Sequence, residues 1–186
     1  MDQISDEMDI DMNHTTTGEH VHEAERHIRT LKEITRCSFH SLPFKAWPKA
    51  MITEGAQLHT EQLNYFPAKG GISPYYSPHT IITGKAIDFK KDLKHAFGTY
   101  VQAFRENHPT NTNEARTTDA IYLRPVPNKQ GGHLVMDLKT GKVVTRVKVI
   151  EYPMPEWVIA RVEKLAKRDG IKGLQVQSRA AWIAGV

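Results

Sequence analysis

Within residues 18–36, GEHVHEAERHIRTLKEITR, the carboxylate of Glu25 is set into a stripe of cations. On the period of an α-helix, Glu25 shares a face with Arg29, Lys32 and Arg36. A glutamate in this setting either forms surface ion pairs, which stabilise a helix only slightly, or supplies an oxygen ligand to a divalent metal ion. Cations in a row suit the phosphates of a nucleic acid. Two chemistries therefore stay open: a solvated salt-bridge face, and a metal-holding acid beside a nucleic-acid track.

Histidines are the other candidate ligands in this stretch, at His20, His22 and His27. His20 and His22 form an H-x-H pair, but no third ligand stands near them at the spacing that a metal site needs. We therefore interpret the pair as a polar region at the start of a helix.

A second group of cations surrounds the sequence KTGK at residues 139–142. This sequence predicts a tight hairpin, because Gly141 adopts positive φ without steric cost. The basic residues in and after it are Lys139, Lys142, Arg146 and Lys148. They form either a phosphate-binding edge or a charged strand edge that resists aggregation.

The charge of the chain is unevenly distributed. Its 186 residues include 25 Lys and Arg and 21 Asp and Glu, a formal net charge of +4. Five of the acids lie in residues 1–18, which contain no Lys or Arg, so the remainder carries 25 basic against 16 acidic residues, a net of +9. A basic body of this kind suits an anionic partner, nucleic acid first.

The single cysteine, Cys37, excludes an internal disulfide and a cysteine-rich zinc site. We expect it to pack as a small apolar group on the first helix. The N-terminus does not have the pattern of a signal peptide, and no apolar run approaches the roughly 20 residues that span a bilayer. We therefore expect a soluble intracellular chain without a membrane partner.

Apolar side chains at helical spacing predict three helices. The first covers residues 19–40 and ends before Pro43, because the residue before a proline avoids helical geometry. The second covers about residues 45–64. The third covers residues 155–170, is amphipathic, and ends at Gly170. Its apolar stripe is Val158, Val162 and Leu165.

Prolines and glycines break the periodicity in residues 66–89, which we expect to be an ordered connector with a short helix after Ser77. Within it, Tyr75 and Tyr76 either pack or stack on bases; packing is the simpler interpretation. Four further aromatic residues are expected in the core: Trp47, Tyr65, Phe66 and Trp157.

From Phe97 onward the hydrophobic period changes to two, which is typical of strands. The predicted strands are residues 97–104, 119–126, 133–138 and 142–150. A polar loop over 105–118 and a turn over 128–132 separate the first three. Four short strands predict a small antiparallel barrel or a curled sheet.

These landmarks, in this order, resemble the integrase region of copia-type LTR retrotransposon polyproteins. The resemblance covers about residues 12–170. It rests on HVHEAERHIRTLKE, Trp47, SPHTIITGKAIDF, FGTYVQAF and GGHLVMDLKTGKVV.

The resemblance implies a ribonuclease-H-like integrase core in which two aspartates on strands and one glutamate on a helix hold two divalent ions, Mg²⁺ in the family. Glu25 takes the place of that glutamate. Two such ions stabilise both the attacking and the leaving oxygen of a displacement at phosphorus, which joins the element's DNA to a target strand.

The implied fold is α+β. Residues 1–18 form an acidic N-terminal segment, and 19–96 form the C-terminal part of the integrase core, mainly its helices, with the connector. Residues 97–152 form a small antiparallel β-barrel-like module, 153–170 an amphipathic helix, and 171–186 a tail.

The sequence departs from the family pattern upstream of Glu25. Only 24 residues precede it, too few for the strands that carry the family's aspartates, and Asp9 and Asp11 would stand on the wrong strand. The family's zinc-binding His/Cys module is also missing. We therefore expect a truncated fragment, in which the helical half has lost the sheet that upstream strands would supply.

In such a fragment Glu25 is a vestigial catalytic residue and an incomplete metal site, because one carboxylate cannot organise two metal ions. We expect no bound cofactor, no catalysis by the chain alone, and weak non-specific DNA binding. The expected DNA-contacting residues are Arg29, Lys32, Arg36, Lys139, Lys142 and Arg146.

Two alternatives remain open. The β module and the last helix would serve a non-enzymatic adaptor for DNA or chromatin protein. Alternatively, another integrase-derived chain would supply both aspartates in trans and complete an active integrase.

Overall fold

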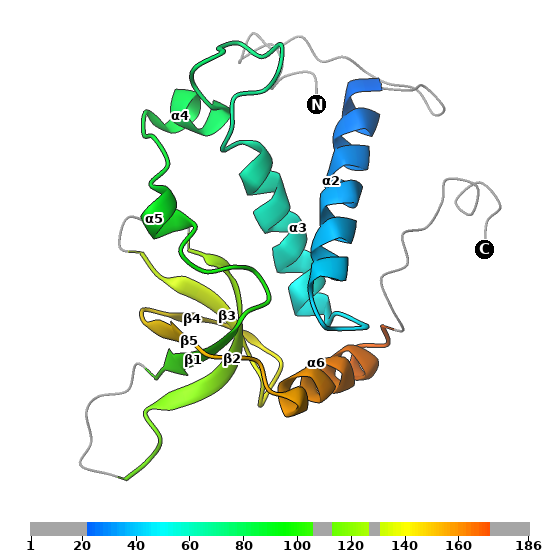
Figure 1. The fold of residues 1–186 in the computed structure, drawn as a ribbon, viewed down its shortest axis with the longest axis vertical. Helices are drawn as coiled ribbons and strands as arrows, with labels where there is room; N and C mark the ends of the chain where they lie inside the picture. The colour runs from blue at the N-terminus through cyan, green and yellow to red at the C-terminus, as the bar shows by residue number, and fades with distance from the viewer. Residues whose placement is uncertain (1–21, 106–112, 127–130, 172–186) are drawn as a thin grey trace, which may run out of the picture. The chain divides into compact units, whose positions relative to one another are not determined.

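The structure, a computed structural model, describes residues 22–105, 113–126 and 131–171 (Figure 1). The described residues fall into two units, one that ends at Thr30 and one that begins at Leu31. The expectations for residues 1–18 and for 172–186 lie outside the described residues. The helices are α2 (His22–Ser41), α3 (Lys49–Leu63), α4 (Pro78–Thr83), α5 (Phe89–Asp92) and α6 (Glu156–Arg168). The strands are β1 (Tyr100–Phe104), β2 (Thr117–Pro125), β3 (His133–Asp137), β4 (Val143–Arg146) and β5 (Val149–Glu151).

The architecture is α+β, as predicted, but the β module is an open sheet and not a closed barrel. Its five strands are antiparallel in the order β4-β3-β2-β1-β5. The single strand predicted over 142–150 is wrong: the chain breaks there into β4 and β5, at opposite edges of the sheet. Only Val147 and Lys148 join these two edges, so the sheet must curl strongly.

The predicted hairpin at residues 139–142 is confirmed. Gly141 has a φ of 76°, and its N–H donates to the carbonyl of Asp137. The Asp137 carboxylate also accepts hydrogen bonds from the N–H and the hydroxyl of Thr140. Asp137 therefore closes the turn between β3 and β4 with its own side chain.

The main core lies between the sheet and the helices α3 and α6. Trp47, fully buried just before α3, is in this core with Met51 of α3. The sheet contributes Tyr100, Ile121, Leu123, Met136 and Leu138, and α6 contributes Val158, Val162 and Leu165. For α3, the expectation of a missing sheet is therefore wrong, because the β module supplies one.

A second cluster fills the inside of the curl on the other face of the sheet. It consists of Val101, Ala103, Ala120, Tyr122, Val135 and Val149. Successive residues of β2 alternate between the two clusters: Ala120 and Tyr122 belong to the second, Ile121 to the main core. This alternation is the period of two that predicted the strands.

Several predicted burials are wrong. Trp47 is in the core as expected, but Phe66 is 56% exposed and Trp157 is 50% exposed. Trp157 precedes the buried stripe of α6 by one residue and instead meets the ring of Tyr100 edge-on. Cys37 is exposed on α2, so it does not pack as a small apolar group.

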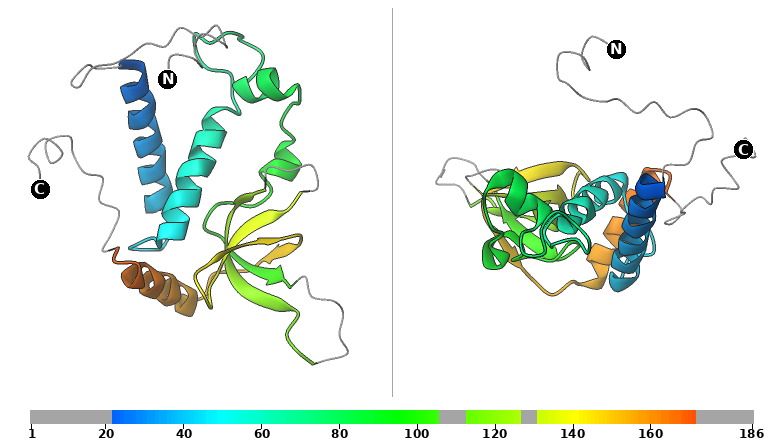
Figure 2. Two further views of the ribbon diagram at one scale, coloured as in Figure 1. Left: turned by 180° about the vertical axis from the view of Figure 1, so that it is seen from behind. Right: turned by 90° about the horizontal axis from the view of Figure 1, so that it is seen from above.

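A β-bulge in β2 determines how α3 meets the sheet. The register between β2 and β3 shifts between Tyr122 and Arg124, so that Leu123 is the extra residue. Without this shift Arg124 would face the same side as Tyr122, away from α3. The bulge turns it towards α3, whose ribbon lies beside the sheet in Figure 2. There Arg124 contacts three side chains.

The Arg124 guanidinium binds successive turns of α3. Its Nε donates to Glu54 at 2.7 Å, its Nη1 to Glu61 at 3.2 Å, and its Nη2 to the Gln57 side-chain oxygen at 2.7 Å. The Arg124 side chain is only 11% exposed. We call this group the Arg124 clamp.

Replacing Arg124 with Met is expected to lower the free energy of unfolding by about 3 kcal/mol, because it leaves two acids without their cation in a part-buried site. Urea denaturation of the full chain measures this. The matched control is Arg116→Met, an exposed arginine just before β2, which should change stability little. Equal effects of the two substitutions would show that the clamp does not hold α3 to the sheet.

Candidate nucleic-acid interface

The predicted residues on the first helix all lie in α2. Arg29, Lys32 and Arg36 are exposed, and Glu25 is partly exposed. Within the described residues there is no group of three or more His, Cys, Asp or Glu side chains that could hold a metal ion. The role of Glu25 as a former metal ligand therefore stays a prediction from the sequence.

The predicted cations of the hairpin lie along β4 and its turn. Lys139 and Lys142 are exposed at the turn, and among the described residues neither forms an ion pair. Arg146 is half-buried at the other end of β4, roughly 13 Å from Lys142 by the rise of a strand. Its Nη1 donates to the carbonyl of Thr145, and its Nε is buried without a partner in the described structure. Arg146 is thus less available to a ligand than the two lysines.

Helix α6 brings further cations to the same turn. Arg161 donates to the carbonyls of Leu138 and Lys139 at 2.7 and 2.6 Å. Two helical turns further, Arg168 donates to the carbonyl of Thr140 at 2.9 Å. These bonds fix α6 against the hairpin but neutralise neither arginine, because a carbonyl carries no net charge. We call Lys139, Lys142, Arg161 and Arg168 the hairpin–α6 cluster.

The sequence groups Arg161 and Arg168 with Lys164 and Lys167 in a third basic cluster on the final helix, separate from the cluster of the hairpin. The signal available was the basic last turn of the final helix, but nothing in the sequence states that this helix meets the hairpin. Gly141 is the local adaptation to that contact: a Cβ there would lie 2.6 Å from Nη2 of Arg168.

Three carboxylates of the hairpin and of α6 with its C-terminal end take part in hydrogen bonds of the fold itself. Asp137 closes the hairpin turn. Glu163 accepts the backbone N–H of Lys45, and Asp169 accepts that of Lys49. Asp169 also makes a long contact of 3.4 Å with Arg168. Because these acids bind mostly neutral backbone donors, the cations around them keep a local excess of positive charge.

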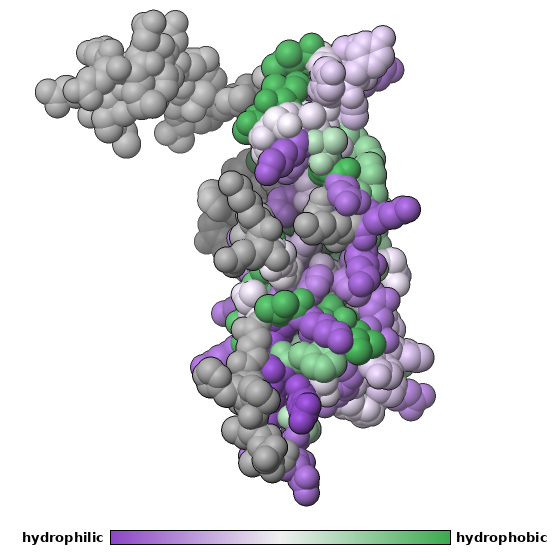
Figure 3. Space-filling view, turned by 90° about the vertical axis from the view of Figure 1, so that its left-hand side faces the viewer, coloured by the Kyte–Doolittle hydropathy of each residue, from purple (hydrophilic) through white to green (hydrophobic). Residues whose placement is uncertain are grey.

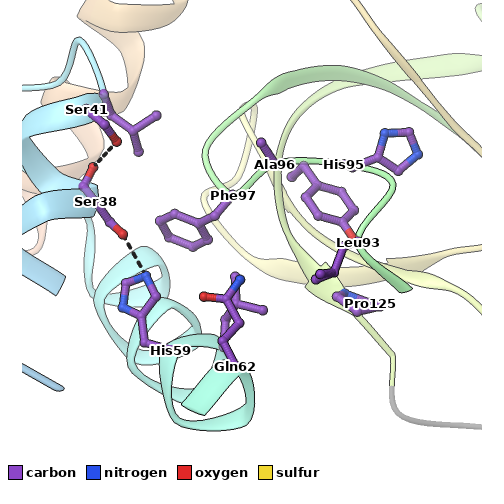
Figure 4. A pocket seen from close by; sticks show the side chains of 12 residues that line it. Ser38, Ser41, His59, Gln62, Leu93, His95, Ala96, Phe97 and Pro125 are labelled. Carbon is purple, nitrogen blue, oxygen red and sulfur yellow. Dashed lines mark hydrogen bonds between the residues drawn. The ribbon is translucent and has the colours of Figure 1, made fainter. Parts of the chain in front are cut away.

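A separate cavity of about 330 Å³ opens between α2, α3, the segment that precedes β1, and β2 (Figure 4). Ser38, His59 and Gln62 form one wall, and Phe97 projects between them and His95 on the opposite side. His59 is 2% exposed. The cavity therefore places one buried imidazole beside polar and aromatic groups.

The hydrogen bonds of His59 assign its tautomer. Thr35 donates its hydroxyl hydrogen to the carbonyl of Leu31, so at 3.1 Å it accepts from Nδ1–H of His59. Ser38 then donates to Nε2 at 2.8 Å. A hydroxyl beside an imidazole is the start of a nucleophile–base pair. Ser38, however, lies within α2, where the backbone N–H groups are used by the helix, so we interpret His59 as a polar tie between α2 and α3.

Two histidines have pKa values lowered by burial. Desolvation lowers the pKa of His59. Desolvation, with smaller contributions from His95 and Lys94, also lowers the pKa of His133, whose Nδ1 is buried without a partner in the described structure. Both side chains are therefore neutral in the folded protein at physiological pH.

No helix within the described residues is long and apolar enough to cross a membrane. No protein-family model, curated protein or solved structure matches this chain.

Stability is expected to fall as the pH drops below about 6.5, the ordinary pKa of histidine. In that range the unfolded chain takes up protons at His59 and His133 that the folded chain does not, so protonation favours unfolding. Urea denaturation at neutral and at mildly acidic pH measures the effect. His59→Gln should reduce the loss of stability between the two pH values, and His40→Gln, at an exposed position at the end of α2, should not. An unchanged pH dependence in His59→Gln would contradict the assignment.

Proposed function

We propose that this chain is an integrase-like unit of a copia-type retroelement that binds DNA weakly and without sequence preference, and that it does not catalyse strand transfer alone. The observation that carries the DNA-binding part is the hairpin–α6 cluster, whose arginines are held in place by carbonyls and whose lysines are free of ion pairs among the described residues. The link to retroelements rests on the ordered sequence landmarks.

We further infer that α2 and α3 correspond to the C-terminal helices of a ribonuclease-H-like core. The order of elements supports this: a long helix with Glu25 in its first turns, a second helix, a connector rich in proline and glycine, and then a small antiparallel sheet. In the resembled family the same order follows the last acid of the active site.

The proposed mode of binding is phosphate contact. Lys139 and Lys142 extend from a turn that Asp137 and Gly141 hold rigid, so little ordering is needed when they meet a phosphate backbone. Phosphate contacts position a protein on DNA but do not read bases. The exposed cations Arg29, Lys32 and Arg36 of α2 supply a second basic face.

We expect duplex DNA to bind with a dissociation constant on the order of 10⁻⁵ M near physiological salt, and a log–log salt slope of about −3 for three or four phosphates. Replacing both Lys139 and Lys142 with Ala should reduce the slope by about 2, since each phosphate contact contributes roughly 0.9. The control is Lys69→Ala with Lys85→Ala, two exposed lysines of the connector, which should change neither quantity.

Filter binding across a salt series measures both quantities. An affinity for duplex DNA that does not depend on salt from about 50 mM upward would contradict the proposal that these cations contact DNA. Equal effects of the two double substitutions would show that charge alone, and not the hairpin–α6 cluster, drives binding.

A second expectation concerns catalysis. The purified chain should neither process nor join DNA ends with Mg²⁺ or Mn²⁺, because Glu25 is a single carboxylate and two-metal chemistry needs several. A strand-transfer assay with labelled DNA ends measures this. Activity of the unmodified chain that disappears in Glu25→Gln would refute the proposal that it is non-catalytic.

A further inference from the structure

The connector between α3 and α5 exposes large apolar side chains. Ile72 is 96% exposed, Ile82 is 83% exposed and Ile81 is 47% exposed. Tyr75 and Tyr76 are 85% and 61% exposed, so the interpretation that they pack within the connector is wrong. Isoleucine is among the residues most often buried, and a contiguous apolar patch on a surface marks an interaction site. Figure 3 shows hydrophobic surface at the end of the view where the connector and α4 lie.

These side chains surround a shallow groove of about 270 Å³. Its apolar lining is Ala68, Ile72, Tyr76, Pro78, Ile81 and Ile82. The groove is thus formed by two short segments, the loop before α4 and α4 itself.

Local hydrogen bonds hold both segments in shape. The Ser73 hydroxyl accepts the N–H groups of Tyr75 and Tyr76 at 3.2 and 3.0 Å. Ser77 caps the start of α4 by accepting from the N–H of Thr80, and Gly84 ends the helix with a φ of 68°. Because the groove is already ordered, a ligand would spend little free energy on arranging it.

Two further contacts anchor the groove to the rest of the fold. The N–H of His79 donates to the carbonyl of Asn64 at the end of α3, at 3.0 Å. The ring of His79 also meets the ring of Tyr65 edge-on. The apolar side chains are therefore presented on a supported surface.

The charge around the groove selects among possible partners. Residues 64–87 contain Lys69 and Lys85, both exposed, and no Asp or Glu. Lys69 follows the lining residue Ala68, and Lys85 comes three residues after Ile82. A second copy of this chain on the same surface would bring lysines against lysines. Nucleic acid would pair with the lysines but would leave the isoleucine side chains without apolar partners.

We propose that this groove binds an acidic segment of a partner protein, in which apolar side chains enter the groove and carboxylates pair with Lys69 and Lys85. This proposal does not depend on DNA binding, because the groove and the hairpin–α6 cluster share no residue.

The test uses the full chain and fluorescent peptides of equal length. One peptide alternates Asp with Leu, a second alternates Lys with Leu, and a third alternates Asp with Ser. We expect the Asp–Leu peptide to bind, and the other two to bind at least about tenfold more weakly, since each provides only one of the two matching features.

Ile82→Asp should reduce binding of the Asp–Leu peptide at least about tenfold, because it places a charge in the groove and opposite carboxylates. Lys69→Glu with Lys85→Glu should reduce it similarly. The matched control is Ile28→Asp, at an isoleucine of α2 that is 52% exposed, and it should leave binding unchanged. Circular dichroism establishes that each variant is folded, and the connector's exposed positions are chosen so that folding is retained.

Four outcomes would overturn the proposal. The first is no binding of the Asp–Leu peptide, and the second is equal binding of the Asp–Leu and Lys–Leu peptides. The third is a dimer in sedimentation that Ile82→Asp dissociates, which would assign the groove to a second copy. The fourth is a loss of DNA affinity in Ile82→Asp, which would assign it to nucleic acid.

Discussion

The Arg124 clamp is the interaction on which the joining of helix and sheet depends. Glu54, Gln57 and Glu61 are three and four residues apart on α3, so they line one face, and one planar guanidinium reaches all three. Burial raises the pKa of Glu61, and Arg124 acts in the opposite direction. Because desolvation offsets much of the attraction, the clamp selects one orientation of α3 more than it adds stability. The burial of Trp47 and Met51 in the main core also joins α3 to the sheet.

Arg161 and Arg168, at the other end of the sheet, have a different role from Arg124. Arg124 binds carboxylates at 2.7 and 3.2 Å, whereas Arg161 binds two carbonyls, and Arg168 binds one carbonyl and makes only a long contact of 3.4 Å with the Asp169 carboxylate. The second arrangement fixes α6 on the hairpin and at the same time concentrates positive charge there. In our proposal, the same side chains therefore hold α6 to the hairpin and form the DNA-binding surface.

The elements that the sequence predicts well are those with local signals. Ser77 before a proline predicts α4, Gly141 predicts the hairpin, and the spacing of Val158, Val162 and Leu165 predicts the buried face of α6. The failures concern contacts between distant segments. The alternation of apolar and polar residues in KVVTRVKVI continues through the bend at Val147 and Lys148. The sequence therefore gives no sign that this stretch divides into β4 and β5.

The candidate site shows the same limit. Lys139, Lys142 and Arg146 could be identified from the sequence as cations near a turn, but the half-burial of Arg146 and the arrival of α6 depend on the packing of the sheet. The bulge at Leu123 likewise has no signature, because IYLR has the same alternation with or without it. The exposure of Ile72 and Ile82 could not be predicted from residue type either, because isoleucine is usually buried.

The two proposed surfaces carry the same sign of charge and therefore attract the same class of partner at long range. What separates them is the apolar content at short range. The hairpin–α6 cluster offers cations and carbonyl-bound arginines, so the free energy of the proposed DNA binding would come from counterion release and would weaken steeply with salt. The groove offers isoleucine and tyrosine, so the proposed binding there would bury apolar surface. Such binding would show a negative change in heat capacity, and salt would alter that change little. If both proposals hold, DNA and an acidic protein segment would bind one chain together, each at the surface whose short-range chemistry it matches.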